Sequence, residues 1–166
     1  LKIEFKPHPN LLVGYQKGIT AFKAGKFQQA IDHLKLANEL DPRYRLGENQ
    51  MTVMEVLKKA KEQLTKKRAD EKAWTTIFSK SKSAVGRKEW HLALTGLGKI
   101  PKKFSLYKDV VSLKISITER LELFASDRKR AAERIATGSC HEAIPLLEEV
   151  IASDPADKEA RLLLKA

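Results

Sequence analysis

Few residues of this sequence combine the types and the spacing that a reaction requires. Cys140 and His141 are adjacent, and a thiol beside an imidazole is a combination that nucleophilic catalysis uses. Consecutive residues on a helix point in different directions, so this pair is a poor catalytic dyad. We therefore expect Cys140 to be a buried packing residue at the start of a helix.

Two histidines, His91 and His141, hold the same position in two similar segments. No HExxH or Cys/His spacing accompanies them, so they are expected to be exposed polar residues and not metal ligands. The motif Gly96-x-Gly98-Lys99 lacks the rest of a phosphate loop and follows a helical pattern, which is typical of a helix end. The sequence predicts no catalytic residue, no metal site and no cofactor, and a protein that is not an enzyme.

The elements that carry these residues are predicted to be helices throughout. Residues 48–85 and 102–137 contain neither Gly nor Pro, and no sustained apolar/polar alternation indicates a strand. Apolar residues recur at spacings of three and four, as in Leu12, Tyr15, Ile19 and Phe22. The fold class is therefore all-α, with residues 46–85 and 106–135 each forming one long helix or two helices joined without a breaker.

Three segments have the pattern of a helical hairpin, near residues 11–41, 73–100 and 124–153. The first and last match closely when their glycines are overlaid, and the middle one is weaker. The matching residues are Gly25, Phe27, Ala30, Leu34, Ala37 and Pro42, then Gly138, Cys140, Ala143, Leu147, Val150 and Pro155, with Lys88, Trp90, Ala93 and Leu97 between them.

These patterns resemble the second half of a tetratricopeptide repeat (TPR). The resemblance implies a right-handed α-α superhelix, a TPR-like solenoid, whose surface binds a peptide or protein. The repeat period of that family is 34 residues, whereas Ala30, Ala93 and Ala143 are 63 and 50 residues apart. We therefore expect extra helix between the hairpins, which makes two helices unusually long.

The predicted domain organisation is an extended lead-in over residues 1–9 and one TPR-like helical domain over residues 10–166. Because the sequence starts at Leu1 without a signal peptide, we expect a fragment of a larger protein, with a membrane anchor outside these residues left open. A single cysteine fits the cytoplasm, which we favour, and is compatible with the periplasm.

Positive charge is concentrated in one part of the chain. The formal net charge is +11, and residues 43–88 hold 13 basic and five acidic residues, a net charge of +8. This stretch is either a solvated helix face or a docking surface for an acidic protein, nucleic acid or anionic lipid. Nucleic acid is the weakest partner, because no aromatic residues are interleaved to stack bases. Membrane contact is expected only through flanking regions, because the apolar face is needed for packing.

These observations favour a non-catalytic scaffold module that binds a peptide or protein, possibly acidic in charge, within a larger bacterial assembly. The alternative is a basic surface module that contacts an anionic membrane or nucleic acid. The candidate partner-binding residues are Tyr15, Lys17, Ile19, Phe22, Gln50, Met54, Lys58, Lys59, Lys66, Lys67 and Arg68.

Overall fold

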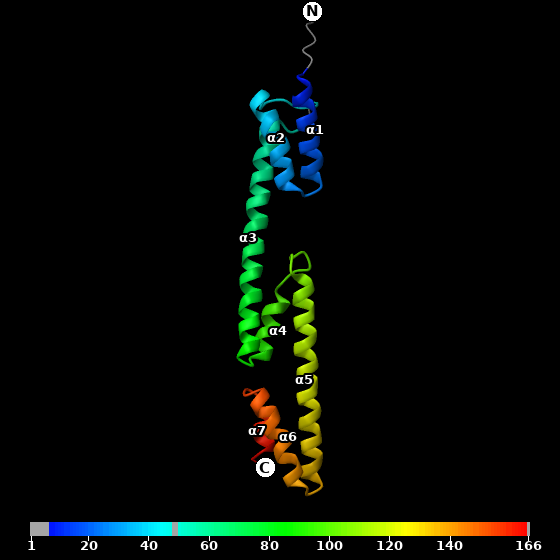
Figure 1. Ribbon diagram of the computed structural model, residues 1–166, viewed down its shortest axis with the longest axis vertical. Helices are drawn as coiled ribbons and strands as arrows, with labels where there is room; N and C mark the ends of the chain where they lie inside the picture. Colours follow the sequence, from blue (N-terminus) through cyan, green and yellow to red (C-terminus); the bar gives the residue numbers. More distant parts are fainter. Residues whose placement is uncertain (1–6, 48–49, 166) are drawn as a thin grey trace, which may run out of the picture. The chain divides into compact units, whose positions relative to one another are not determined.

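The computed structural model describes residues 7–47 and 50–165, and within them every regular element is an α-helix (Figure 1). The predicted all-α fold class is thereby confirmed. The helices of this part of the chain are α1 (Pro9–Lys23), α2 (Phe27–Leu40), α3 (Val53–Gly86), α4 (Trp90–Gly98), α5 (Tyr107–Ala136), α6 (Cys140–Ser153) and α7 (Lys158–Leu163).

The two long breaker-free stretches are each one continuous helix. Helix α3 has 34 residues and α5 has 30. Helix α1 begins at Pro9, inside the predicted lead-in, because proline is favourable at the first position of a helix and the His8 side chain accepts a hydrogen bond from the Asn10 N–H. Pro7 and His8 precede this helix without regular structure, and residues 1–6 of the predicted lead-in lie outside the described residues.

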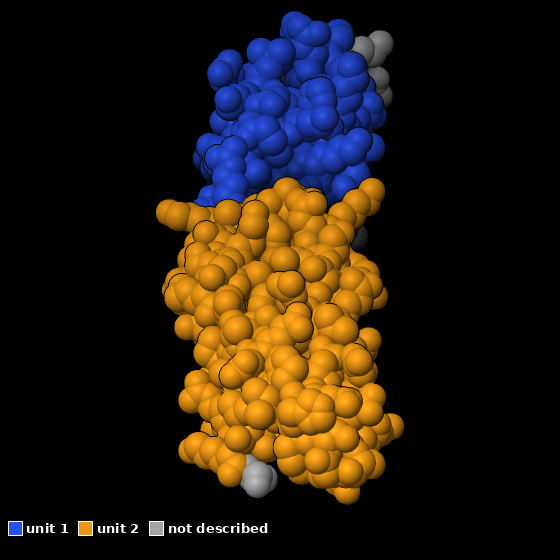
Figure 2. Space-filling view, turned by 60° about the horizontal axis from the view of Figure 1, so that its bottom comes forward, with its two compact units in different colours: residues 1–70 blue, residues 71–166 orange. Residues whose placement is uncertain are grey.

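The chain divides into two compact units, residues 1–70 and residues 71–166 (Figure 2). Helix α3 begins in the first unit and ends in the second. Between Leu64 and Trp74 it has no buried side chain; Asp70 and Glu71 are partly buried, and Glu71 accepts a hydrogen bond from the Ser105 N–H. The single domain over residues 10–166 stays a prediction, because repeat proteins are held together by contacts between neighbours and can contain several compact units.

In unit 1, α1 and α2 form a hairpin that packs with the first part of α3. Tyr15 and Leu34 are fully buried in its core. The Tyr15 hydroxyl donates a hydrogen bond of 2.6 Å to the Met51 carbonyl, just before α3 begins. A Cβ atom on Gly18 would lie 2.4 Å from Leu34, so glycine is needed for this close helix approach.

In unit 2, α5 contacts two hairpins: the one formed by α3 and α4, and the one that it forms with α6. Its first part packs on the second part of α3 and on α4, and the Phe104 ring, which precedes α5, lies 6.2 Å from both Trp74 and Phe78. Its later part packs against α6 and α7, and Phe124 lies 6.4 Å from Trp90 on α4. Trp90, Phe78 and Phe104 are buried, so their rings contribute to the packing between these helices.

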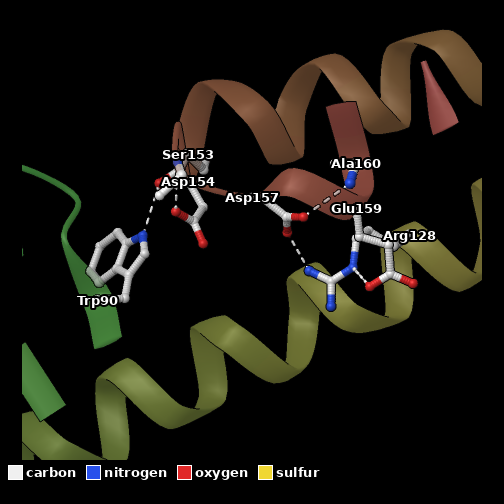
Figure 3. Close-up of polar contacts among 8 residues, drawn as sticks. Trp90, Arg128, Ser153, Asp154, Asp157, Glu159 and Ala160 are labelled. Atoms are coloured by element: carbon white, nitrogen blue, oxygen red, sulfur yellow. Dashed lines mark hydrogen bonds and ion pairs between the residues drawn. The ribbon is translucent and has the colours of Figure 1, made fainter. Parts of the chain in front are cut away.

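Polar contacts join these two hairpins within unit 2 (Figure 3). The Trp90 indole donates a 2.9 Å hydrogen bond to the Ser153 carbonyl at the end of α6. Lys88 donates to the neighbouring Ala152 carbonyl. Carbonyls at a helix C-terminus lack partners inside the helix, so these two donors satisfy groups that would otherwise need water. Helix α7, which the sequence analysis did not predict, is held to α5 by an ion pair between Asp157 and Arg128.

The three hairpin turns have the same backbone structure. In each, the residue two places before the second helix has a left-handed conformation: Gly25 at φ 70°, Lys88 at φ 62° and Gly138 at φ 79°. Its N–H bonds to a carbonyl three residues back, and the next N–H bonds to a carbonyl five residues back. This is the Schellman motif, which ends a helix by satisfying two of its last carbonyls.

Candidate functional site

The side chains with catalytic or metal-binding chemistry, Cys140, His141 and His91, lie on the surface. Cys140 is exposed, so the expectation of a buried cysteine is wrong. It is the first residue of α6, where the equivalent residues Phe27 and Trp90 fill the space above the turn with a ring that a thiol does not have. His91 and His141 are exposed, as expected, and Gly98 is the last residue of α4, as its motif indicates.

Neither a cluster of metal ligands nor a membrane-spanning helix is found among the described residues. Within residues 7–47 and 50–165, no three His, Cys, Asp or Glu side chains lie close enough together to hold a metal ion. In the same part of the chain, no helix combines the length and the apolar character that crossing a bilayer requires.

The predicted contact residues of unit 1 fall into two groups. Tyr15 has no exposed surface, and burial raises the pKa of its hydroxyl. It is a core residue, so we remove it from the contact surface. Ile19 and Phe22 are half-buried and also pack on this core. Lys17, Gln50 and Met54 are exposed, with Met54 at 55%.

The basic candidates all lie on α3 and are all exposed. They are Lys58, Lys59, Lys66, Lys67 and Arg68, accompanied by Lys61 and Lys72. Arg68 donates a 3.2 Å hydrogen bond to the Gln28 side chain, and none of the seven forms an ion pair with a carboxylate in the described part of the chain. We call these seven residues together the α3 basic face; at 3.6 residues per turn they point to several sides of the helix. Its charge is left for solvent or for a partner.

A groove of about 650 Å³ lies in unit 2 along the seam between α3 and α4. Helix α3 contributes Ile77, Lys80 and Ser81 to one wall, and α4 contributes Leu92, Thr95 and Gly96 to the other. Arg87, directly after α3, and Lys99, directly after α4, complete the lining. Ser81 faces Gly96 so closely that a Cβ on this glycine would lie 2.3 Å from the serine Oγ. We call this opening the α3–α4 groove.

The electrostatics of the α3–α4 groove are positive. No Asp or Glu is among its lining residues. Arg87 donates two hydrogen bonds to Glu89, of 3.1 and 2.7 Å, which raise the pKa of Arg87 and lower that of Glu89. Lys80 and Lys99 have no ion pair within the residues that the structure describes.

The other hairpins have a smaller opening on the equivalent side. Counted back from the left-handed turn residue, Lys80 occupies the same position as Lys17 and Arg130. Lys17 lines an opening between α1 and α2, and Arg130 lines one beside the end of α5. Each of these positions directly precedes a small buried residue at the closest helix approach: Gly18, Ser81 and Ala131.

Sequence reasoning missed the α3–α4 groove although a signal was present. Overlaying the three turns places Lys17, Lys80 and Arg130 at one position, but only Lys17 was among the predicted contact residues, because the first hairpin has the stronger match to the repeat. Comparisons of the chain with family models, with curated proteins and with solved structures gave no match in any of the three.

Proposed function

We propose that this chain is a non-catalytic interaction module that binds an acidic segment of a peptide or protein, within a larger bacterial assembly. The observation that carries the proposal is the α3 basic face: seven exposed cations on one helix, without an ion pair to a described carboxylate. Such a surface attracts an acidic partner and accelerates its approach.

We further propose that the hairpins belong to a TPR-like superhelix with elongated helices. The three equal Schellman turns support this architecture, as do the buried small residues Ala30, Ala93 and Ala143 at one position of the second helices. A buried leucine follows each alanine after four residues, at Leu34, Leu97 and Leu147. Equal turns and equal packing positions are what a repeated structural unit requires.

The proposal is tested by presenting the full chain with a random peptide library displayed on phage. We expect the selected peptides to be enriched in Asp and Glu, and their binding to weaken as salt is added, because exposed charges are screened. The variant K58E/K59E/K66E/K67E should lose most of this binding. A selection without enrichment, or an enrichment in basic or neutral peptides, would contradict the proposal.

The alternative is that the same cations contact nucleic acid or an anionic membrane. It is tested in a parallel experiment. A labelled DNA duplex and phosphatidylserine vesicles are titrated with the protein at the same salt concentrations. The alternative is favoured if the protein binds the DNA or the vesicles more tightly than the selected peptides, and if this binding weakens steeply with added salt.

A further inference from the structure

We infer that the α3–α4 groove is a docking site for an acidic peptide segment that carries one apolar side chain. This inference rests on the proposed function and adds the place and the chemistry of the contact. It concerns unit 2 alone, and the α3 basic face up to residue 68 lies in unit 1.

The shape of the groove favours a chain segment over a flat surface contact. Its volume of about 650 Å³ lies in the range of pockets that enclose a few side chains or a small ligand. Both walls are helices, and none of the lining residues belongs to α5, so α5 does not cover this side of the hairpin. Rigid helical walls hold a bound segment at little entropic cost to the protein.

The apolar part of the ligand is indicated by Leu92 and Ile77. Leu92 is 59% exposed, although its neighbour in sequence Ala93 is fully buried, and Ile77 is half-buried on the facing wall. The Gly96 position lies beside Ile77 and Ser81, so Leu92, four residues earlier on α4, lies about one helical turn away from Ile77 along the groove. A leucine-sized side chain placed against Leu92 would remove apolar surface from water. The Thr95 hydroxyl donates to the His91 carbonyl, and its oxygen can accept a hydrogen bond from a peptide N–H.

The acidic part is indicated by charge complementarity. Lys80, on α3, and Lys99, directly after α4, have no ion pair in the described part of the chain, and no carboxylate lines the groove. Two ammonium groups in a groove that also exposes Leu92 match a segment that carries carboxylates and one apolar residue. A second observation is that a cation recurs at positions 17, 80 and 130. In each hairpin this residue lines an opening.

The test measures fluorescence polarisation of a short fluorescein-labelled peptide in which one Leu lies among Glu and Asp residues. Binding should weaken about tenfold when K80E/K99E replaces the wild-type chain, and also when the peptide Leu is changed to Ser. Leu92→Ser should weaken binding about fivefold, with little effect on folding because this side chain is exposed. Circular dichroism and thermal unfolding verify that each variant is folded.

The matched control is K108E/K129E, which makes the same change of net charge at two exposed lysines of α5 in the same unit. It should keep the affinity within about twofold. Equal losses in this control and in K80E/K99E would overturn the groove assignment, because they would indicate non-specific attraction. The groove assignment would also be overturned if the peptide does not bind, or if its affinity is unchanged when its Leu is replaced by Ser.

The outcomes separate the two proposals. If the peptide binds and K58E/K59E/K66E/K67E abolishes binding while K80E/K99E leaves it unchanged, the interaction function stands and the groove is not its site. If library selection gives no acidic peptide and this probe also fails, both proposals are wrong.

Discussion

At the scale of single residues, the start of α3 is held by a capping box. The Thr52 N–H donates a 2.8 Å hydrogen bond to the Glu55 carboxylate, and the Glu55 N–H donates to the Thr52 hydroxyl at 3.3 Å. These bonds satisfy two donors that a helix start leaves without partners. Hydrogen bonding to its charged form lowers the pKa of Glu55 below 4.5, first through the Thr52 backbone and then through its side chain.

The lowered pKa of Glu55 makes part of the stability depend on pH. The folded state favours the carboxylate, so its stabilising effect is present above the ordinary pKa of 4.5 and is lost as the pH falls through the lower, folded value. We predict that Glu55→Gln flattens this acid-side loss, because glutamine still caps but does not titrate. Urea unfolding at several pH values measures the effect. Equal pH dependence in the variant and the wild type would contradict this assignment.

Another residue-scale feature is the ion pair of Arg128 with Asp157. The Asp157 carboxylate also accepts a 2.9 Å hydrogen bond from the Ala160 N–H, and so caps α7. Its side chain is only 5% exposed, and that of Arg128 is 23% exposed. Arg128 also reaches the exposed Glu159 at 3.1 Å. The pair therefore holds α7 against α5 (Figure 3).

We predict that Arg128→Met lowers the free energy of unfolding by about 2 kcal/mol, because it leaves a nearly buried carboxylate without its cation. Asp157→Asn should cost less, since asparagine remains a good helix cap. The double variant R128M/D157N should be more stable than R128M alone. Urea denaturation gives the three values, and strictly additive effects would show that the two side chains do not interact.

At the scale of elements, the hairpin turns depend on the left-handed residue that ends each first helix. Gly25 and Gly138 have positive φ values, and a Cβ atom on either would meet nothing within 4 Å. A side chain at either position would therefore change the stability only through strain in the backbone. Gly86 is a useful comparison, because it also faces open space but has no positive φ value.

We predict that Gly138→Ala lowers the free energy of unfolding by about 1 kcal/mol, since alanine is strained in the left-handed region. The control Gly86→Ala should be neutral or stabilising by up to about 1 kcal/mol, because alanine favours a helix more than glycine does. Thermal unfolding of both variants gives the comparison. The account of the turns fails if Gly138→Ala is as stable as Gly86→Ala.

Most helices could be predicted at this scale, because breakers and apolar periodicity are local properties of the sequence. Helix α7 was missed although Asp157 is a good capping residue, since only six residues follow as helix and give no clear period. The burial of Tyr15 and the exposure of Cys140 depend on which elements cover each side chain. The covering residues can be distant in the sequence; for example, the Met51 carbonyl accepts a hydrogen bond from the Tyr15 hydroxyl.

At the scale of the whole molecule, α3 connects two units that each have their own core. Residues 65–73 of this helix contribute no buried side chain to either core. Helical stability in proteins comes mainly from packing of an apolar face, which this stretch does not have. Its helical structure must rely on propensity and on continuity with the packed parts on either side.

We predict that Ala69→Pro breaks the helix locally and makes this stretch sensitive to limited proteolysis. Proline in a helix interior costs about 3 kcal/mol or more, yet no core contact is lost at this exposed residue. Both cores should therefore keep their slow hydrogen exchange. Ala69→Ser is the control and should resist the protease. Loss of protection in both cores of Ala69→Pro would show that the units depend on an unbroken α3.

The most direct measurement of the central claim is hydrogen–deuterium exchange of the full chain with and without a peptide from the acidic library selection. If the helix surfaces bind an acidic segment, bound peptide should slow exchange on α3, with further protection along α4 if the segment occupies the α3–α4 groove. Unchanged exchange on both helices, with protection confined to other elements, would contradict the account.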